Sequence, residues 1–359
     1  MLSVLLVAPR LEARGSSSYA MRLFRQLPAR GIDLHVLSSE PRPPALGPAP
    51  DLRWTCFPQL HNPLLGRLVL ALFLRELRRN PPDLIHAPTR RMLPLATILG
   101  RALRVPVIAT AHHHLAPGDR VRLDRRVVQR LVAVSESIKT DLLRHSRLPD
   151  PFIEVIVGGV EADPALEAVL PFDPGHTPVI GTAGPLEAVK GIPYFLGAAQ
   201  RVLGAGRSVE FLVAGSGPEE ANLRRLSREL GLSAHVTFVP YVLDFLGTLA
   251  AMDLFVLPSL QQGLGTVMLE AMSLARPVIA SGVGGVYSVV RDGETGLVVP
   301  PSQSEPLAAR MLDLLTDPDR ARRLGQNART LVREQFNADR MLDETVGLYH
   351  EIAEITVPA

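Results

Sequence analysis

The chain has 359 residues, of which 47% are hydrophobic and 21% charged, with a formal net charge of +2. That length is typical of two domains that each bury a core, and the composition excludes a disordered or collagen-like chain. The single cysteine, Cys56, excludes an intrachain disulfide and a zinc site built from cysteines, and it favours a reducing compartment.

Two apolar runs, residues 4–8 and 68–74, are the candidates for a signal peptide or a membrane span. Pro9 and Arg10 interrupt the first run at once, so it predicts a buried strand. The second run has seven residues, whereas a membrane-spanning helix needs about 20. We therefore expect a cytoplasmic protein.

The charge is distributed unevenly. Residues 1–170 contain 23 Lys and Arg against 15 Asp and Glu, whereas residues 171–359 contain 15 against 21. A basic half favours an anionic partner such as a membrane surface, a nucleic acid or a phosphorylated substrate. A solvated basic surface accounts for the same charge equally well.

The first half alternates short apolar runs with amphipathic stretches. The runs lack strict alternation, which is typical of strands buried on both faces. These predicted strands are residues 3–8, 33–38, 83–87, 105–110 and 131–134. Amphipathic stretches such as 19–27 and 63–79 lie between them, and this order predicts β-α-β units in a parallel sheet.

The second half repeats this pattern after a proline-rich linker at residues 161–177. Its predicted strands are residues 179–182, 210–214, 236–238, 254–257 and 277–280. The chain is helical in pattern from residue 307 onward. Two doubly wound domains bind ligands at the carboxyl ends of their strands, so the cleft between facing domains is the expected site.

The segment with the strongest functional signal is residues 257–272, LPSLQQGLGTVMLEAM. A predicted strand leads into a loop with Gly263 and Gly265, and a helix starts near Thr266. The free amides and the dipole of a helix start favour an anion such as a diphosphate. Glu270 lies one turn later on the same face and could accept hydrogen bonds from two vicinal hydroxyls. The alternative is an ordinary strand-loop-helix turn with an exposed glutamate.

Three further loops could contact a phosphate. Lys190 precedes a glycine in IGTAGPLEAVKG and could neutralise phosphate, or be a solvated lysine beside a turn. Gly215, in VAGSGPE, begins an incomplete dinucleotide fingerprint, for which a tight turn is the better explanation. Gly15 and Ser16 precede a helix and form either an anion site or a plain cap.

Other polar clusters give weaker signals. The histidines at 112–114 follow a predicted strand but lack a nearby carboxylate or further histidine, so we expect no metal site there. Asp317 and Asp319 form a D-x-D with a proline inside, between helical stretches, which predicts a helix-connecting turn.

The ordered set of segments resembles the large retaining family 4 of glycosyltransferases, or glycosyl transferases group 1. The matching pieces are PDLIHAP, VPVIATAH, VAVSESIK, IVGGVEA, AGPLEAVKG, VAGSGPEE, MDLFVLPS, QGLGTVMLEAM, RPVIASGVGG and DGETGLVVPP. The resemblance implies an α/β protein with the GT-B fold, two Rossmann-like doubly wound parallel-sheet domains facing across a cleft. Residues 1–165 would form the acceptor side, 166–335 the nucleotide-sugar donor domain, and 336–359 a helix crossing back.

The resemblance also implies residue roles. Glu270 would hold the donor ribose, Lys190 would neutralise the diphosphate, and His112 would lie near the donor sugar; these three are the candidate catalytic residues. The remaining candidate donor-binding residues are Gly15, Ser16, Gly215, Gln262, Gly263, Leu264, Gly265 and Thr266.

This sequence departs from the family pattern at three positions. Gln262 stands where the family has the first Glu of E-x7-E, which touches the transferred sugar, so sugar preference or activity would change. Pro185 stands where the family has an arginine, so a phosphate-binding charge is missing. Gly158 replaces an asparagine.

The resemblance thus implies a metal-independent, retaining transfer from a nucleotide-diphosphate sugar, without a cofactor. A lipid-linked glycan or polysaccharide acceptor of the cell envelope is favoured, and no nucleic-acid partner is expected. Arginines at 67, 75, 78 and 79 flank an apolar helix face, which suggests peripheral contact with an anionic membrane. The alternatives are a catalytically weakened nucleotide-binding protein with a regulatory or scaffold role, and an epimerase or phosphorylase on the same fold.

Overall fold

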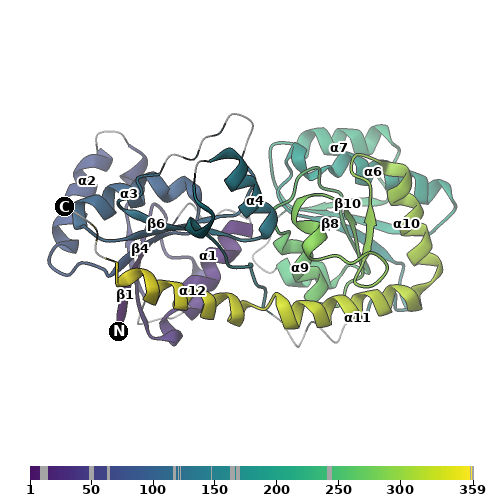
Figure 1. The fold of residues 1–359 in the computed structure, drawn as a ribbon. Coiled ribbons are helices and arrows are strands. Elements are labelled where there is room, and N and C mark those ends of the chain that lie inside the picture. Colours follow the sequence, from purple (N-terminus) through teal and green to yellow (C-terminus); the bar gives the residue numbers. More distant parts are fainter. Residues whose placement is uncertain are drawn as a thin grey trace. The chain divides into compact units, whose positions relative to one another are not determined.

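The computed structural model describes residues 1–8, 15–47, 52–62, 65–115, 119, 121, 123–146, 148–161, 166, 170–240, 245–355 and 357. The chain folds into two compact units (Figure 1). Unit 1 consists of Met1–Val157 and Ala338–Ala359, and unit 2 of Gly158–Asn337. The sequence placed these boundaries at 165/166 and 335/336, and residues 162–165 and 167–169 of the expected linker lie outside the described residues.

Unit 1 is built on a parallel sheet in the order β3-β2-β1-β4-β5-β6-β7. Its strands are β1 (Leu2–Val7), β2 (Ile32–Ser38), β3 (Arg53–Cys56), β4 (Leu84–Ala87), β5 (Val107–Ala111), β6 (Val128–Ala133) and β7 (Ile153–Val155). Its helices are α1 (Gly15–Gln26), α2 (Leu65–Leu77), α3 (Leu93–Leu103), α4 (Glu136–His145) and α12 (Ala338–Ala353). Short 3-10 helices are η1 (Pro28–Arg30), η2 (Pro44–Leu46), η3 (Pro58–His61), η4 (Arg90–Met92) and η5 (Asp150–Phe152).

Unit 2 repeats this design with the order β10-β9-β8-β11-β12-β13. Its strands are β8 (Val179–Ala183), β9 (Glu210–Ala214), β10 (Val236–Val239), β11 (Leu254–Leu257), β12 (Val278–Ser281) and β13 (Leu297–Val299). Its helices are α6 (Ile192–Gly204), α7 (Glu220–Glu229), α8 (Phe245–Ala250), α9 (Thr266–Ser273), α10 (Ser304–Thr316) and α11 (Pro318–Gln335), with 3-10 turns η6 (Ala188–Lys190) and η7 (Gly284–Ser288).

Both sheets reverse their strand order once. In unit 1 the reversal lies between β1 and β4, and in unit 2 between β8 and β11. All the pairings are parallel, so the carboxyl ends of the strands of each sheet share one edge. In open α/β sheets ligands bind outside this edge at the reversal point. The loops that follow β1, β4, β8 and β11 are therefore the expected ligand-binding segments.

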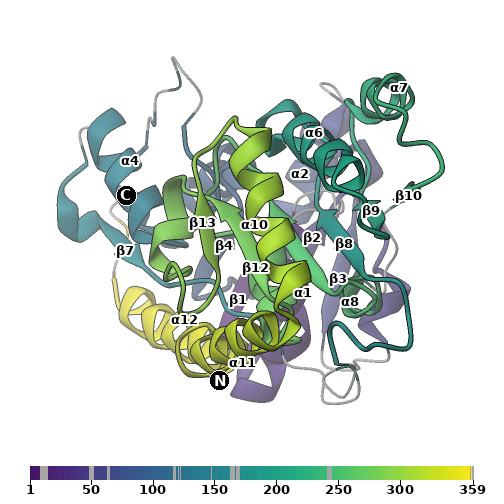
Figure 2. The ribbon, with the colours of Figure 1, turned by 90° about the vertical axis from the view of Figure 1, so that its right-hand side faces the viewer.

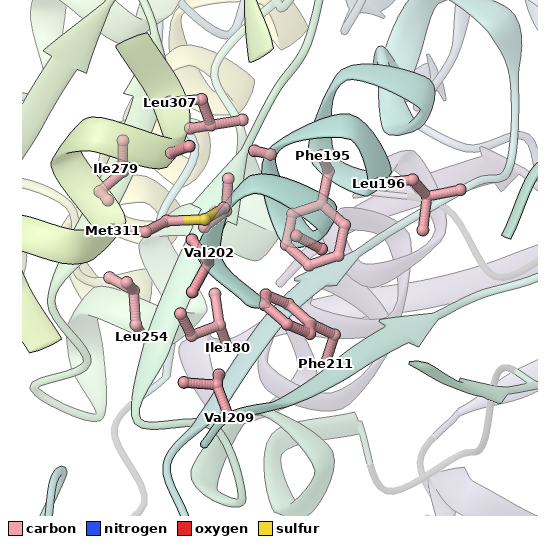
Figure 3. Packing of buried hydrophobic residues seen from close by; sticks show 14 of the residues in the cluster. Ile180, Phe195, Leu196, Val202, Val209, Phe211, Leu254, Ile279, Leu307 and Met311 are labelled. Carbon is pink, nitrogen blue, oxygen red and sulfur yellow. The ribbon is translucent and has the colours of Figure 1, made fainter. Parts of the chain in front are cut away.

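Each unit has its own apolar core. In unit 2, α6 and α10 pack together over one face of the sheet (Figure 2). Phe195 of α6 meets Phe211 of β9 edge to face at 5.9 Å, and Met311 of α10 joins Ile180 and Leu254 of the sheet (Figure 3). The central strands are continuous apolar runs because helices cover them on both sides. In unit 1 the corresponding core includes residues of α1, the sheet and α12.

The last helix completes unit 1. Met341, Leu342 and Tyr349 of α12 are buried in the core of that unit. On the surface, Arg30 forms ion pairs with Asp339 at 2.6 Å and with Asp343 at 2.9 Å. The chain therefore returns to its first unit after completing the second.

Every strand predicted from the sequence overlaps a strand of the structure, and the parallel doubly wound architecture is confirmed. The sequence did not predict β3, β7 and β13. Among the described residues, no helix combines the length and the apolar character required to cross a bilayer.

Candidate functional site

The loop between β11 and α9 lies at the reversal point of unit 2. Gly265 precedes α9 with φ of 87°, in the left-handed region that glycine adopts without strain. Within the described part of the chain no side chain caps this helix start. The first backbone N–H groups of α9 therefore point toward the edge where an anion would be stabilised.

Lys190 and Gln262 meet across this reversal point. Lys190 follows β8, Gln262 follows β11, and the Lys190 Nζ donates to the Gln262 Oε1 at 3.0 Å. The buried Ser259 hydroxyl donates to the same oxygen at 3.2 Å. Two predicted site residues 72 positions apart are thus brought into direct contact.

Glycines let the loops of this edge approach closely. A Cβ on Gly191 would overlap the carbonyl of Pro258, and one on Gly285 would overlap the carbonyl of Gly263. Backbone hydrogen bonds join the same loops, from Leu260 N to Val189 O at 2.8 Å and from Gly285 N to Gln262 O at 3.1 Å. The loops after β8, β11 and β12 therefore form one interlocked surface.

Two neighbouring segments extend this surface. Gly215, after β9, has φ of 149° and lies where a Cβ would overlap the Gly184 carbonyl, and Leu186 N donates to Ser216 O at 3.0 Å. Gly158 faces the buried Leu264, whose Cδ2 would lie 2.9 Å from an added Cβ. A larger residue at 158 would displace Leu264 from the loop, which gives a physical reason for glycine there.

Glu270 is buried within α9, with a relative exposure of 8%. It lies one turn after Thr266, and its backbone oxygen accepts a hydrogen bond from Ser273 at 2.7 Å. The alternative of an exposed surface glutamate is therefore wrong. A buried carboxylate close to a helix start provides directed hydrogen-bond acceptors in a region of low solvent access.

His112 is the candidate site residue of unit 1 whose surroundings are described. It follows β5, its Nε2 lies 2.9 Å from the Pro88 carbonyl, and its ring meets Tyr19 edge to face at 4.9 Å. Burial lowers the pKa of His112 to about 4, so the ring is neutral at pH 7. Because a carbonyl only accepts, the proton is on Nε2, and Nδ1 is the acceptor nitrogen.

A buried polar chain beside His112 was missed by the sequence analysis. His86 in β4 bonds to the Tyr349 hydroxyl at 2.6 Å through Nδ1 and to Thr110 at 2.9 Å through Nε2. Thr110 lies 3.5 Å from the Tyr19 hydroxyl. A histidine inside the apolar run of residues 83–87 was the available signal, because such a residue needs buried hydrogen-bond partners.

The remaining candidates are placed as follows. Gly15 and Ser16 open α1 in unit 1, and residues 9–14 lie outside the described residues. His114 Nδ1 lies 3.6 Å from Asp141, yet within the described ranges no three His, Cys, Asp or Glu side chains gather as metal ligands would. Asp317 caps α11 by accepting from Arg320 N at 2.9 Å, which confirms the turn predicted for the D-x-D.

Comparison with known families and proteins agrees with this architecture. Residues 171–331 match the family model Glycosyl transferases group 1, and residues 13–164 match Glycosyltransferase Family 4. The chain is 34% identical to an alpha-D-kanosaminyltransferase of Streptomyces kanamyceticus. The match covers 49% of this chain and only 46% of that relative. It is 28% identical to a D-inositol 3-phosphate glycosyltransferase of Rhodococcus erythropolis, over 95% of this chain and 87% of the relative.

Solved structures show the same fold. The HepE protein (Alr3699) of Anabaena, in complex with UDP and glucose, superposes with a TM-score of 0.82 at 20% identity, covering 98% of this chain and 100% of that one. A sucrose-phosphate synthase of Thermosynechococcus elongatus gives 0.79 at 23% identity, covering 98% and 99%. These likenesses show the two-domain GT-B fold.

Proposed function

The chain belongs to the group 1 and family 4 glycosyltransferases and has the GT-B fold, and from this we propose that it transfers a sugar from a nucleotide-diphosphate sugar with retention at the anomeric carbon. The observation that carries the proposal is the contact between Lys190 and Gln262 beside the uncapped start of α9. It brings a cation to a helix start that no described side chain caps, at the edge where a doubly wound sheet binds ligands.

In this proposal the donor's diphosphate lies against the amides from Gly263 to Thr266 and beside Lys190. These groups are in place before the reaction, so they stabilise the negative charge that develops as the bond between the anomeric carbon and the diphosphate breaks. Buried Glu270 accepts hydrogen bonds from the ribose hydroxyls. Gly215 belongs to the adjoining loop of the donor site.

The proposed reaction is a displacement at the anomeric carbon. The acceptor oxygen attacks the anomeric carbon on the face that the diphosphate leaves, and the leaving phosphate oxygen takes the acceptor's proton. For His112 we propose the role that the family resemblance implies, that of a neutral hydrogen-bonding group, which acts through Nδ1 because Nε2–H is engaged with Pro88. No metal or cofactor takes part in these steps.

The test is turnover by the purified protein, using UDP-, GDP- and ADP-sugars with glycan and lipid-linked acceptors. We expect release of one nucleoside diphosphate with an acceptor, an anomeric proton signal that matches the donor's configuration, and no loss of activity in EDTA. Inversion would contradict retention, and a requirement for added metal would contradict metal independence. Product formed from donor alone, or only with phosphate, would favour an epimerase or a phosphorylase.

The competing proposal is a nucleotide-binding regulator or scaffold. Two departures favour it, because Pro185 supplies no charge to the phosphate and Gln262 supplies no carboxylate to the sugar. Nucleotide binding without transfer or hydrolysis of any donor would support this alternative. Turnover by the pure protein would eliminate it.

For the acceptor, we propose a glycan linked to a lipid, reached through contact of α2 with an anionic membrane. Leu65, Leu68 and Leu72 share one face of α2 and are 51%, 60% and 59% exposed. Phe73 and Leu77 of the same helix are buried. An exposed leucine stripe separate from the packed face is typical of a surface that contacts another apolar phase.

The charge around this stripe is complementary to anionic lipid. Exposed Arg75, Arg78 and Arg79 follow the leucines at the end of α2, with Glu76 as the neighbouring acid. Unit 1 contains 24 Lys and Arg against 17 Asp and Glu. The side chain of Arg67 lies outside the described residues.

This contact is tested by cosedimentation with vesicles of phosphatidylglycerol at low salt. We expect binding that is lost when Leu68 and Leu72 are both changed to Ser and that weakens as salt increases. The matched control is Leu170→Ser, which changes an exposed leucine of unit 2. Equal binding by the α2 double variant and the control would contradict the proposal.

A further inference from the structure

A buried polar chain links α12 to the strands of unit 1. The Tyr349 hydroxyl of α12 lies 2.6 Å from Nδ1 of His86 in β4, and Nε2 of His86 lies 2.9 Å from the Thr110 hydroxyl in β5. The Thr110 hydroxyl lies 3.5 Å from the Tyr19 hydroxyl in α1. All four residues are at most 3% exposed. Because buried polar groups cost free energy unless they are paired, such a chain favours one arrangement of its members.

The protons of this chain have a defined direction. Among the described residues, His86 Nδ1 is the hydrogen-bond partner of the Tyr349 hydroxyl, so Tyr349 donates and Nδ1 accepts. Burial lowers the pKa of His86 to about 3, so the ring is neutral and its one proton is on Nε2, which donates to Thr110. Thr110 in turn directs its own proton toward the Tyr19 oxygen. The chain therefore runs in one direction from α12 to α1.

Tyr19 connects this chain to His112. The two rings meet edge to face at 4.9 Å, and the Tyr19 hydroxyl also bonds to Thr345 of α12. Thr345 donates its own proton to Met341 O at 2.7 Å, so it accepts from Tyr19. The second contact of the His112 ring is the bond from Nε2 to the Pro88 carbonyl at 2.9 Å. The Tyr19 ring and this carbonyl together set the orientation of the His112 ring.

We propose that Tyr19 is a positioning residue for His112, and that Tyr349 and His86 hold Tyr19 in place for this task. The inference rests on the role proposed for His112. It makes α12 a support of the candidate site in unit 1, although the chain reaches α12 only after completing unit 2. Apolar side chains could fill the same space, but they would allow several arrangements, whereas the hydrogen-bonded chain specifies one.

Steady-state kinetics of Tyr19→Leu test this role in the transfer reaction. The substitution keeps an apolar side chain but removes the ring and the hydroxyl, so kcat should fall about tenfold. The KM for the donor should stay within about twofold of wild type, because the proposed diphosphate and ribose contacts are in unit 2. Phe24→Leu is the matched control, because Phe24 is a buried aromatic residue of the same helix whose ring packs against Trp54. Its kcat should change less than about twofold.

A double-mutant cycle separates positioning from folding. In the His112→Ala background no ring is left to position, so the effect of Tyr19→Leu on kcat should fall below about twofold. An undiminished loss in that background would show that Tyr19 acts independently of His112 and would overturn the inference. Equal losses of kcat in Tyr19→Leu and Phe24→Leu would overturn it as well.

The His112 ring can also be observed without turnover, in ¹⁵N spectra of protein labelled at histidine. Its resonances are identified by their loss in His112→Ala, and in the wild type they should show one tautomer with the proton on Nε2. Tyr349→Phe removes only the hydroxyl at the start of the chain and should add a second tautomer or broaden these resonances. Phe24→Leu should leave them unchanged.

His112 resonances in Tyr349→Phe that match those of the wild type would overturn the role of the buried chain. Absence of turnover with every donor would contradict the proposed function itself. The spectra would then still decide whether Tyr19 and Tyr349 orient His112.

Discussion

Among single residues, the buried polar groups of unit 1 differ in how well they are satisfied. His86 bonds to both Tyr349 and Thr110, so the burial of these groups costs little. Thr89, which follows β4, is only 9% exposed, and its hydroxyl has no hydrogen-bond partner among the residues that the structure describes. It occupies the position before η4 where a threonine normally caps, yet its side chain makes no cap.

The unpaired hydroxyl gives a direct stability prediction. Thr89→Val replaces it with a methyl group of similar shape, which removes a desolvation cost of about 1–3 kcal/mol. We expect the variant to raise the free energy of unfolding by roughly 1 kcal/mol in urea titration. Thr97→Val is the control, because its hydroxyl donates to Leu93 O at 2.7 Å and its loss should destabilise or leave stability unchanged. Destabilisation by Thr89→Val would show that the hydroxyl has a partner in solution.

The loops of the candidate site could be predicted from the sequence, whereas the contacts between their side chains could not. Lys190 and Gly265 could be identified because each follows a recognisable strand and a glycine. The bond between Lys190 and Gln262 could not be predicted, because it depends on β8 and β11 being neighbours in the sheet. The burial of Glu270 could not be predicted either, because the sequence of an eight-residue helix does not show which of its faces is buried.

Among the elements, the predicted strands were those with a strong apolar signature. β3, β7 and β13 were missed, and all three are edge strands of three or four residues. An edge strand is covered less than a central strand, so fewer of its residues need to be apolar. The sequence of β3, RWTC, is an example. The interior strands could be predicted because burial on both faces demands continuous apolar residues.

The interlocked loops of unit 2 depend on glycine. At Gly285 an added Cβ would overlap the Gly263 carbonyl, a backbone atom that moves only with its loop. Gly285→Ala should therefore lower the free energy of unfolding by about 1–3 kcal/mol and weaken nucleotide binding more than tenfold. Thermal melting with and without UDP measures both effects.

Gly204→Ala provides the matched control in the same unit. Gly204 lies in α6 with open space around the added Cβ, so alanine should be neutral or stabilising. Similar losses from both substitutions would show that the contact with Gly263 is not what requires glycine at 285.

Across the whole molecule, the two units differ in charge. Unit 2 contains 14 Lys and Arg against 19 Asp and Glu, so the basic excess belongs to unit 1. Unit 1 also contains three histidines whose pKa burial lowers, His35 and His112 to about 4 and His86 to about 3. Their neutral forms are therefore part of the folded state.

These lowered pKa values predict an acid-sensitive unit 1. Between pH 6.5 and 4 the unfolded chain binds protons that the folded histidines do not, so stability falls as pH falls. The loss should reach several kcal/mol by about pH 5. The single tryptophan, Trp54 of β3, reports on this unit in urea titrations followed by fluorescence.

The histidine responsible can be identified by the slope of stability against pH. His86→Gln should reduce the slope, whereas His350→Gln, on the exposed side of α12, should leave it unchanged. A slope that is the same in both variants would exclude His86 as a source of the acid sensitivity.

The central claim is that unit 2 binds a nucleotide diphosphate with its ribose against Glu270. Calorimetric titration of the wild type and Glu270→Ala with UDP and 2′-deoxy-UDP tests it directly. We predict that the wild type prefers UDP by about tenfold and that Glu270→Ala binds the two nucleotides alike. An undiminished preference for UDP in Glu270→Ala would contradict the account.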